Sequence, residues 1–309
     1  MRIKGRNKYI CNIKAVLIFL VVLGHVLENY LDKPEVLTIY KIIYIFHMPL
    51  FVFISGKMTK SISVCKKQML KSMELYCIFD LFYVVYERVV YDKRLDLFTP
   101  YWHLWYLFAL IVWSALGMLF LWLQEHKVSS KIIFFGTVVA SLMIGMVKFA
   151  DRRFALQRIF AFLPYFYLGM TADIDDIKDK KWVKIASIII SLIAVPIVVI
   201  YVPKSFIYQA TPYSGDILTG ILMRLVCEIT AAAVSILILL YMPDKKFAFT
   251  AVGKDTLPIY VFHPVAIPVI CFFTDISLGV ISGAIIFTAW IIAVIYMASR
   301  FVRPVNYLE

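Results

Sequence analysis

The chain has 309 residues, of which 62% are hydrophobic and only 17% are charged, and its mean hydropathy is +0.84. A water-exposed surface needs about 25% charged residues, so the composition excludes an ordinary soluble domain, a disordered chain, collagen and a coiled coil. The net charge of +12 would indicate nucleic-acid binding in a soluble protein. In a membrane protein, an excess of Lys and Arg on the cytoplasmic loops explains it without nucleic acid.

Ten apolar segments approach the length of about 20 residues that a spanning helix needs. In chain order they are 14–30, 38–56, 72–91, 102–123, 131–149, 154–171, 182–202, 217–241, 256–274 and 277–302. The connections between them are short. We therefore expect an all-α polytopic membrane protein with about ten transmembrane helices, forming a single domain over residues 1–309.

The distribution of basic residues predicts the orientation. With residues at the ends of the segments included, the loops on the same side of the membrane as the N-terminus carry 19 Lys and Arg residues. The loops on the opposite side carry 7. By the positive-inside rule both termini lie in the cytoplasm. The first segment has no small-x-small cleavage site, so we expect a retained helix rather than a signal peptide. The five cysteines form no CxxC pattern, which predicts buried thiols and no metal site.

Ionisable residues at membrane depth are costly and therefore indicate function. Lys14 and His25 are eleven residues apart, almost three helical turns, so they share a face about 16 Å apart along the axis. Glu28 follows His25 by three residues and could orient its imidazole. The alternative interpretation is a hydrogen-bonded core histidine with a lysine that snorkels to the headgroups.

Two more histidines accompany helix-breaking prolines. His47 precedes Pro49 in the second segment, and His263 is followed by Pro264 in the ninth, one turn after Tyr260. A proline frees a backbone carbonyl, which a bilayer tolerates where the break is buried in protein or lines a cavity. For the second segment, a packing kink explains the proline equally well.

Several other side chains could bind ligands. Trp105 lies in the first turn of the fourth segment, where an aromatic belt is the default explanation. Arg158 lies one turn into the sixth segment, and a guanidinium there needs an anion or a polar cavity. The stretch 57–71 contains Lys66, Lys67 and Lys71 and no acidic residue. Positive-inside bias explains these lysines, and they would also suit a phosphorylated cytosolic ligand.

Taken together, these residues resemble a known family. The run from Lys14 through ten residues to His25 is similar to the first helix of the integral-membrane acyltransferase family 3, in particular its fucose 4-O-acetylase-like acetyltransferases. Further blocks match in the same order: Phe46 to Phe51 with Ser55-Gly56, Trp105-Tyr106-Leu107, Arg158 to Gly169, and Tyr260 to His263. Two features depart from the family pattern. Lysine replaces the usual arginine at position 14, and the paired arginines of the first inner loop are not evident where Lys66, Lys67 and Lys71 lie.

The resemblance implies an enzyme of the cell membrane that moves acetyl from acetyl-CoA to a hydroxyl of a carbohydrate or glycolipid. It assigns the base to His25, with Glu28 beside it, and no metal. Lys14, Lys66, Lys67 and Lys71 would bind the phosphates of coenzyme A. The acceptor side would be formed by His47, Trp105, Arg158, Tyr260 and His263. His25 either acts as a general base or carries the acetyl group transiently, and the sequence leaves both open.

Two other classes of function remain compatible with the residues. A proton-coupled transporter or flippase also needs broken helices and buried His and Arg side chains, although no inverted repeat is evident. A structural or sensory bundle with a polar lining would need no catalysis. Transfer of labelled acetyl to a glycan distinguishes the enzyme from both.

Overall fold

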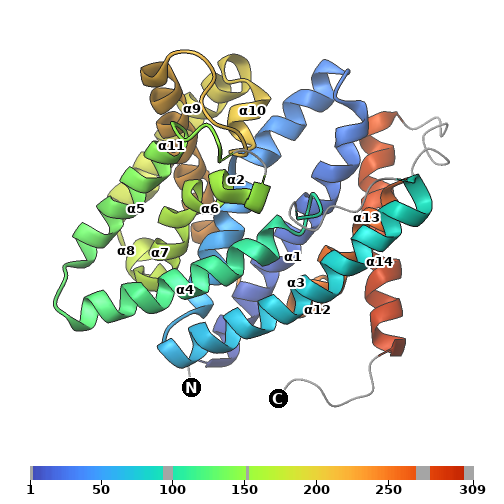
Figure 1. The fold of residues 1–309 in the computed structure, drawn as a ribbon, viewed down its shortest axis with the longest axis horizontal. Helices are drawn as coiled ribbons and strands as arrows, with labels where there is room; N and C mark the ends of the chain where they lie inside the picture. Colours follow the sequence, from blue (N-terminus) through green and yellow to red (C-terminus); the bar gives the residue numbers. More distant parts are fainter. Residues whose placement is uncertain (1–2, 93–99, 151–152, 269–278, 303–309) are drawn as a thin grey trace. The chain divides into compact units, whose positions relative to one another are not determined.

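The computed structural model describes residues 3–92, 100–150, 153–268 and 279–302 (Figure 1). All the regular elements in these ranges are helices, which confirms the predicted all-α class. The chain divides into two compact units. We call residues 1–48 with 234–309 the terminal unit, and residues 49–233 the central unit.

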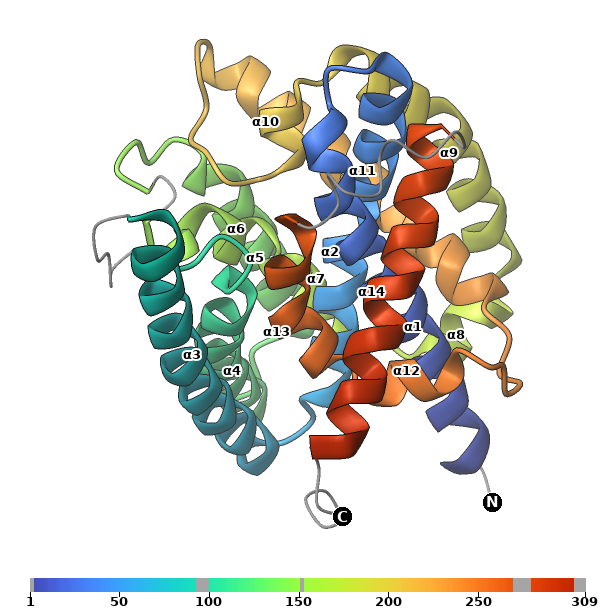
Figure 2. The ribbon, with the colours of Figure 1, turned by 90° about the vertical axis from the view of Figure 1, so that its right-hand side faces the viewer.

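The terminal unit is built around α1 (Ile3–Leu27), which packs against α12 (Thr250–Lys254), α13 (Leu257–Ala266) and α14 (Val280–Val302) (Figure 2). A turn, η1 (Glu28–Tyr30), leads into α2 (Pro34–Met58), whose residues up to Met48 belong to this unit, as do the last residues of α11 (Ile217–Tyr241). Apolar residues at helical spacing form the buried face of α1. They include Ile13, Leu17, Val22 and Val26, each with no exposed surface.

One buried amide fixes the loop between α11 and α12 to α1. The Asn12 Nδ2 donates to the carbonyls of Pro243 and Lys245, both at 2.9 Å. The Thr250 hydroxyl donates to the Asn12 Oδ1 at 2.6 Å and accepts from the backbone N–H of Phe247 at 2.8 Å. Because buried polar groups need partners, this loop has one preferred position on the helix that carries Lys14 and His25.

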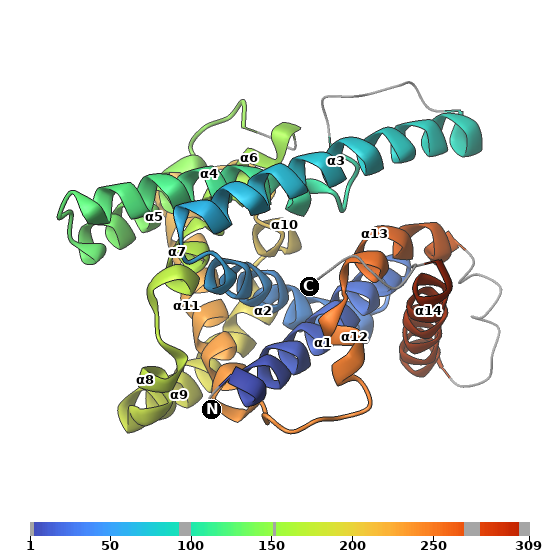
Figure 3. The ribbon, with the colours of Figure 1, turned by 90° about the horizontal axis from the view of Figure 1, so that it is seen from below.

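The central unit contains two long neighbouring helices, α3 (Ile62–Tyr91) and α4 (Trp105–Glu125), which run side by side in Figures 1 and 3. Shorter elements follow: α5 (Ser130–Ile144), η2 (Arg153–Ala155), α6 (Leu156–Ala161), α7 (Leu163–Thr171), α8 (Ile174–Asp179), α9 (Lys181–Tyr201) and α10 (Lys204–Ile207). The first residues of α11 complete the unit. Asp216 caps this helix, because its Oδ2 accepts from the backbone N–H and the hydroxyl of Thr219, both at 2.8 Å.

A buried polar network joins α5, α6 and α11. Arg224 is only 1% exposed and donates to the Ser141 carbonyl at 2.9 Å and to the Gln157 Oε1 at 3.1 Å. Its guanidinium lies over the ring of Tyr213, 4.8 Å from the centroid. One turn further along α11, the Glu228 carboxylate accepts from the Ser141 hydroxyl. The network supplies hydrogen bonds for a buried guanidinium, without which burial would be costly.

The Tyr213 ring packs closely against Gly145 and Gly220, and this close contact predicts the effect of a substitution on stability. A Cβ on Gly220 would lie 2.5 Å from Cγ of Tyr213. That ring is held by its hydroxyl on the Leu142 carbonyl and by its backbone N–H on the Gly145 carbonyl. Gly220→Ala should therefore destabilise the protein by about 1–3 kcal/mol, the usual cost of overpacking.

The control for this variant is Gly136→Ala in α5, where no atom lies within 4 Å of the added methyl group. There, replacing helical glycine by alanine should be neutral or stabilising by up to about 1 kcal/mol. Thermal unfolding in detergent measures both. Equal melting temperatures for Gly220→Ala and Gly136→Ala would contradict a steric clash with Tyr213.

The helix boundaries differ from expectation in two places. The stretch 57–71 is not a loop: α2 continues to Met58, and Ser61 caps α3 by accepting from the Val64 N–H at 3.3 Å. The segment 154–171 is not one span but a turn and two short helices. Pro164 falls in the first turn of α7, where proline is tolerated, instead of in the interior of a longer helix.

Six helices in the described ranges are long and apolar enough to cross a membrane: Lys8–Tyr30, Pro34–Met58, Trp105–Glu125, Lys181–Tyr201, Ile217–Tyr241 and Val280–Arg300. Ser130–Ile144 and Leu257–Ala266 are shorter apolar helices. The segment expected at 256–274 extends into residues outside the described ranges. The count of ten and the orientation with both termini inside stay predictions.

Cysteine labelling at the exposed positions Lys60 and Lys204 tests whether all ten expected segments cross the membrane or only the six long apolar helices. Between Lys60 and Lys204 the ten expected segments include five crossings, whereas only two of the six long apolar helices lie there. Cysteines placed singly at these positions, in a protein without other cysteines, should react with an impermeant maleimide from opposite sides. Reaction from the same side would contradict the ten-span prediction.

Candidate functional site

Two of the three predicted membrane histidines meet in the terminal unit. His25 comes from the last turns of α1 and His263 from α13. The His25 Nδ1 lies 2.8 Å from the His263 Nε2, which is a hydrogen-bond distance. The two ring planes are nearly parallel, 5° apart, and their centroids are 5.0 Å apart. His263 has no exposed surface, whereas His25 is partly exposed.

The backbone of α13 holds the His263 ring. Its Nδ1 lies 3.0 Å from the Ile259 carbonyl oxygen, one turn earlier, and the Tyr260 carbonyl is a second backbone partner. Pro264 has no N–H, so the helical hydrogen bond to the Tyr260 carbonyl is missing and that oxygen is available to another donor. The proline predicted to free a carbonyl therefore does so beside the histidine.

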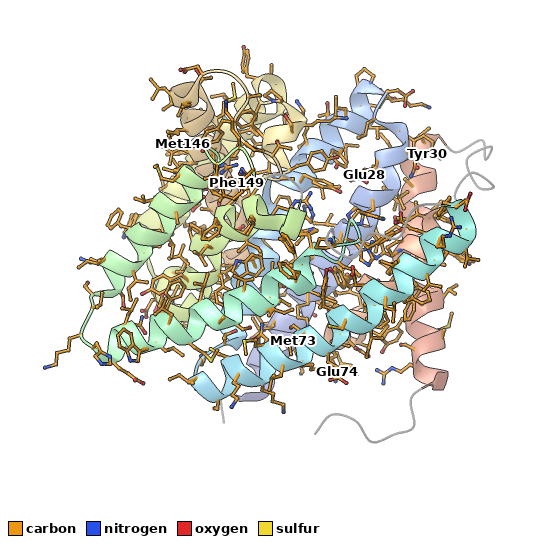
Figure 4. The ribbon with its side chains drawn as sticks, in the orientation of Figure 1. Glu28, Tyr30, Met73, Glu74, Met146 and Phe149 are labelled. Carbon is orange, nitrogen blue, oxygen red and sulfur yellow. The ribbon has the colours of Figure 1, made fainter. Side chains whose placement is uncertain are left out.

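Glu28 is tied to two tyrosines of α2. The α-helix ends at Leu27, and Glu28 begins the following turn (Figure 4). Its Oε1 accepts from the hydroxyls of Tyr40 at 2.9 Å and Tyr44 at 2.8 Å. The same Tyr44 ring meets His25 edge-on, with centroids 6.5 Å apart. Glu28 thus anchors an aromatic side chain that packs against the imidazole.

His47 belongs to the same cluster. It is 2% exposed, and its Nδ1 donates to the Ile43 carbonyl at 2.8 Å. Its ring contacts Tyr44 edge-on at 4.6 Å between centroids. Tyr44 therefore lies against both His25 and His47. The predicted role of His47 in substrate binding is compatible with this position and stays a prediction.

Gly24 allows Tyr44 to approach α1. A Cβ on Gly24 would lie 2.7 Å from Cε2 of Tyr44, and that ring is stacked on Tyr40 at 3.9 Å and bonded to Glu28. Gly24→Ala should displace the ring and lower the melting temperature, because the ring cannot move without breaking these contacts.

Two further variants test whether contact with Tyr44 causes the loss of stability in Gly24→Ala. Gly283→Ala in α14, where nothing lies within 4 Å of the new methyl group, should not lower the melting temperature. The penalty of Gly24→Ala should shrink when Tyr44 is also alanine, since interacting residues are not additive. If Gly24→Ala lowers the melting temperature by the same amount with and without the Tyr44 side chain, contact with Tyr44 is not the cause.

Lys14 lies on the same helix, partly buried, and interacts electrostatically with Asp255 at the end of α12. The ammonium group therefore already has an acidic neighbour in the protein. Lys66, Lys67 and Lys71 are exposed and lie on the first turns of α3, in the central unit. Their role as phosphate ligands stays a prediction.

Trp105 and Arg158 come together in the central unit. The Arg158 guanidinium lies 4.8 Å from the Trp105 ring centroid, which is a cation–π geometry. Its Nε donates to the Tyr208 carbonyl at 3.1 Å. Their expected role in binding the acceptor stays a prediction. Tyr260 lies on α13 in the terminal unit and is half-buried.

Comparison with known proteins now decides the family. The acyltransferase family 3 sequence model, described as an acyltransferase domain, matches residues 7–300. The chain belongs to the acyltransferase 3 family. No match was found among curated proteins, and none among solved structures. The resemblance inferred from the sequence is confirmed at the level of the family, whereas the fucose 4-O-acetylase-like subgroup is not.

Membership of the acyltransferase 3 family, together with the apolar helices, makes the protein a membrane acyltransferase. An acyl transfer needs a group that accepts a proton near neutral pH, and imidazole is the side chain suited to it. Within the described ranges no group of three or more His, Cys, Asp or Glu side chains could hold a metal ion.

Sequence reasoning missed two parts of this acyltransferase. It did not single out Tyr40 and Tyr44, although their spacing of four residues places them on one face of α2. It also passed over Arg224 and Glu228 in the eighth segment, which have the same spacing. Charged residues in an apolar span were the available signal.

Proposed function

We propose that this membrane acyltransferase is an O-acetyltransferase of the cell membrane, of the fucose 4-O-acetylase-like subgroup. It would move acetyl from acetyl-CoA to a hydroxyl of a cell-surface or lipid-linked carbohydrate. The observation that carries the proposal is the pair of His25 and His263, with their ring nitrogens 2.8 Å apart, in a chain of the acyltransferase 3 family.

In the direct reaction, the acceptor hydroxyl oxygen attacks the thioester carbonyl carbon while His25 takes the hydroxyl proton. The carbon–sulfur bond then breaks, and the proton returns to the coenzyme A thiolate. In the alternative, a ring nitrogen of His25 attacks the thioester carbonyl carbon, the carbon–sulfur bond breaks and coenzyme A leaves as the thiolate. The acceptor hydroxyl oxygen then attacks the acetyl carbon, the carbon–nitrogen bond to His25 breaks, and the hydroxyl proton goes to the released ring nitrogen. Both routes need an unprotonated ring nitrogen on His25.

The remaining residues have roles in binding. The positive charges of Lys14, Lys66, Lys67 and Lys71 suit the phosphates of coenzyme A. The guanidinium of Arg158 over the indole of Trp105 suits a carbohydrate bearing a phosphate or carboxylate, because Arg binds such groups bidentately. His47 and Tyr260 would supply further polar contacts for the acceptor, whereas the buried His263 would act on it through His25.

The test is to incubate the purified protein, in lipid, with radiolabelled acetyl-CoA and a lipid-linked glycan. Label in the glycolipid fraction, lost without the protein, is the expected result. Proton flux driven by the glycan without label transfer would instead indicate the transporter. Mass spectrometry of surface glycans from cells with and without the protein would then identify the acceptor by its added acetyl group.

A further inference from the structure

We propose that His263 is a positioning residue that fixes the tautomer of His25, keeping the proton on Nδ1 and the reactive lone pair on Nε2. This inference rests on the proposed function, since it explains how His25 is prepared for acyl transfer. It gives His263 a different task from binding the acceptor.

The backbone of α13 determines which nitrogen of His263 carries the proton. The Ile259 carbonyl oxygen, 3.0 Å from the His263 Nδ1, can only accept a hydrogen bond. The Tyr260 carbonyl, the other backbone partner of this ring, is also only an acceptor. The proton of a neutral His263 must therefore be on Nδ1. An imidazolium would have to lose its hydration in a position with no exposed surface, which is costly.

The tautomer of His25 follows from that of His263. A neutral imidazole has one N–H and one lone pair, so His263 offers the lone pair of Nε2 to its neighbour. The His25 Nδ1, 2.8 Å away, must then be the donor. The lone pair of a neutral His25 is consequently on Nε2. In the opposite arrangement two lone pairs would face each other and a buried hydrogen bond would be lost.

The selected tautomer suits both proposed routes. Either proton abstraction or attack on the thioester would use Nε2, on the side of the ring away from His263. When His25 becomes positively charged, its Nδ1–H bond to His263 becomes a charge-assisted hydrogen bond and is strengthened. This orientation of a base by a third group is the general logic of catalytic triads, where the wrong tautomer lowers kcat by roughly 10⁴-fold.

Two substitutions separate this role from packing. His263→Gln keeps an oxygen that can accept from the His25 Nδ1, whereas His263→Leu keeps the bulk and removes the acceptor. In free histidine the Nε2–H tautomer predominates, so His25 in His263→Leu should move toward that form. His263→Gln should retain the Nδ1–H form and most of the activity.

The primary measurement is nitrogen NMR of ¹⁵N-histidine-labelled protein, with the His25 signals assigned by their loss in His25→Ala. We expect the Nδ1–H tautomer in the wild type and in His263→Gln, and loss of that preference in His263→Leu. Where acetyl transfer is measured, kcat of His263→Leu should fall by at least about 10²-fold with a smaller change in KM. An Nε2–H tautomer in the wild type, or an unchanged tautomer in His263→Leu, would overturn the proposal. Because the NMR signals require no substrate, failure of acetyl transfer alone would overturn only the proposed function.

Discussion

Replacing His25 by alanine should lower the rate of acetyl transfer by about 10²–10⁴-fold, the usual loss when a general base is removed. His25 is the partly exposed member of the histidine pair, and its Nδ1 is engaged with His263 at 2.8 Å. The loss should appear in kcat, because the imidazole acts in the transition state and not in binding alone. Steady-state kinetics with labelled acetyl-CoA measures it.

Two further variants show whether the loss is chemical. His25→Asn keeps an N–H that can donate to the His263 Nε2 but has no titratable nitrogen, so its activity should fall as far as that of alanine. His126→Ala removes an exposed histidine at the end of α4 and should leave the rate unchanged. Activity of His25→Ala within a few-fold of wild type would remove His25 from the mechanism.

The sequence singled out ionisable side chains that the structure brings together, but it placed two of the helix boundaries around them wrongly. Costly ionisable groups in apolar segments are visible in a sequence, so His25, His47 and His263 could be selected, as could Glu28. Their pairing could not, because residues 25 and 263 are distant along the chain and only the packing of α1 against α13 joins them. The spacing of His25 and Glu28 predicted that they are neighbours, and the structure adds Tyr44, which contacts both and could not be selected from the sequence.

The helix boundaries were harder to predict for a local reason. Hydropathy predicts where apolar stretches lie but not whether a helix continues through polar residues. Thus α1 begins at Ile3 among basic residues, and α3 includes the lysines expected in a loop. Conversely, Pro164 divides an apolar stretch that hydropathy treats as continuous. Capping and proline position decide these ends, and both act within one turn.

Lys14 gives the second large expected effect, and it concerns binding instead of chemistry. If its ammonium group binds a phosphate of coenzyme A, then Lys14→Ala should raise KM for acetyl-CoA by about 10-fold or more, since a hydrogen bond to a charged group contributes about 1.5–3 kcal/mol. The change in kcat should be smaller. Lys14→Arg should keep most of the activity, because the charge remains and the related family motif carries arginine there.

The competing explanation is that Lys14 serves the fold through Asp255, its acidic neighbour at the end of α12. Lys14→Ala would then lower the melting temperature and leave KM unchanged, as would Asp255→Asn. Calorimetric binding of acetyl-CoA to the His25→Ala protein, with and without Lys14→Ala, separates the two without turnover. Lys8→Ala, which removes an exposed lysine from the same helix, is the matched control and should not change the affinity. Equal affinities with and without Lys14 would exclude the cofactor role. A loss confined to Lys14→Ala would place a coenzyme A phosphate at this turn of α1, three turns before the histidine that receives the acyl group or the proton.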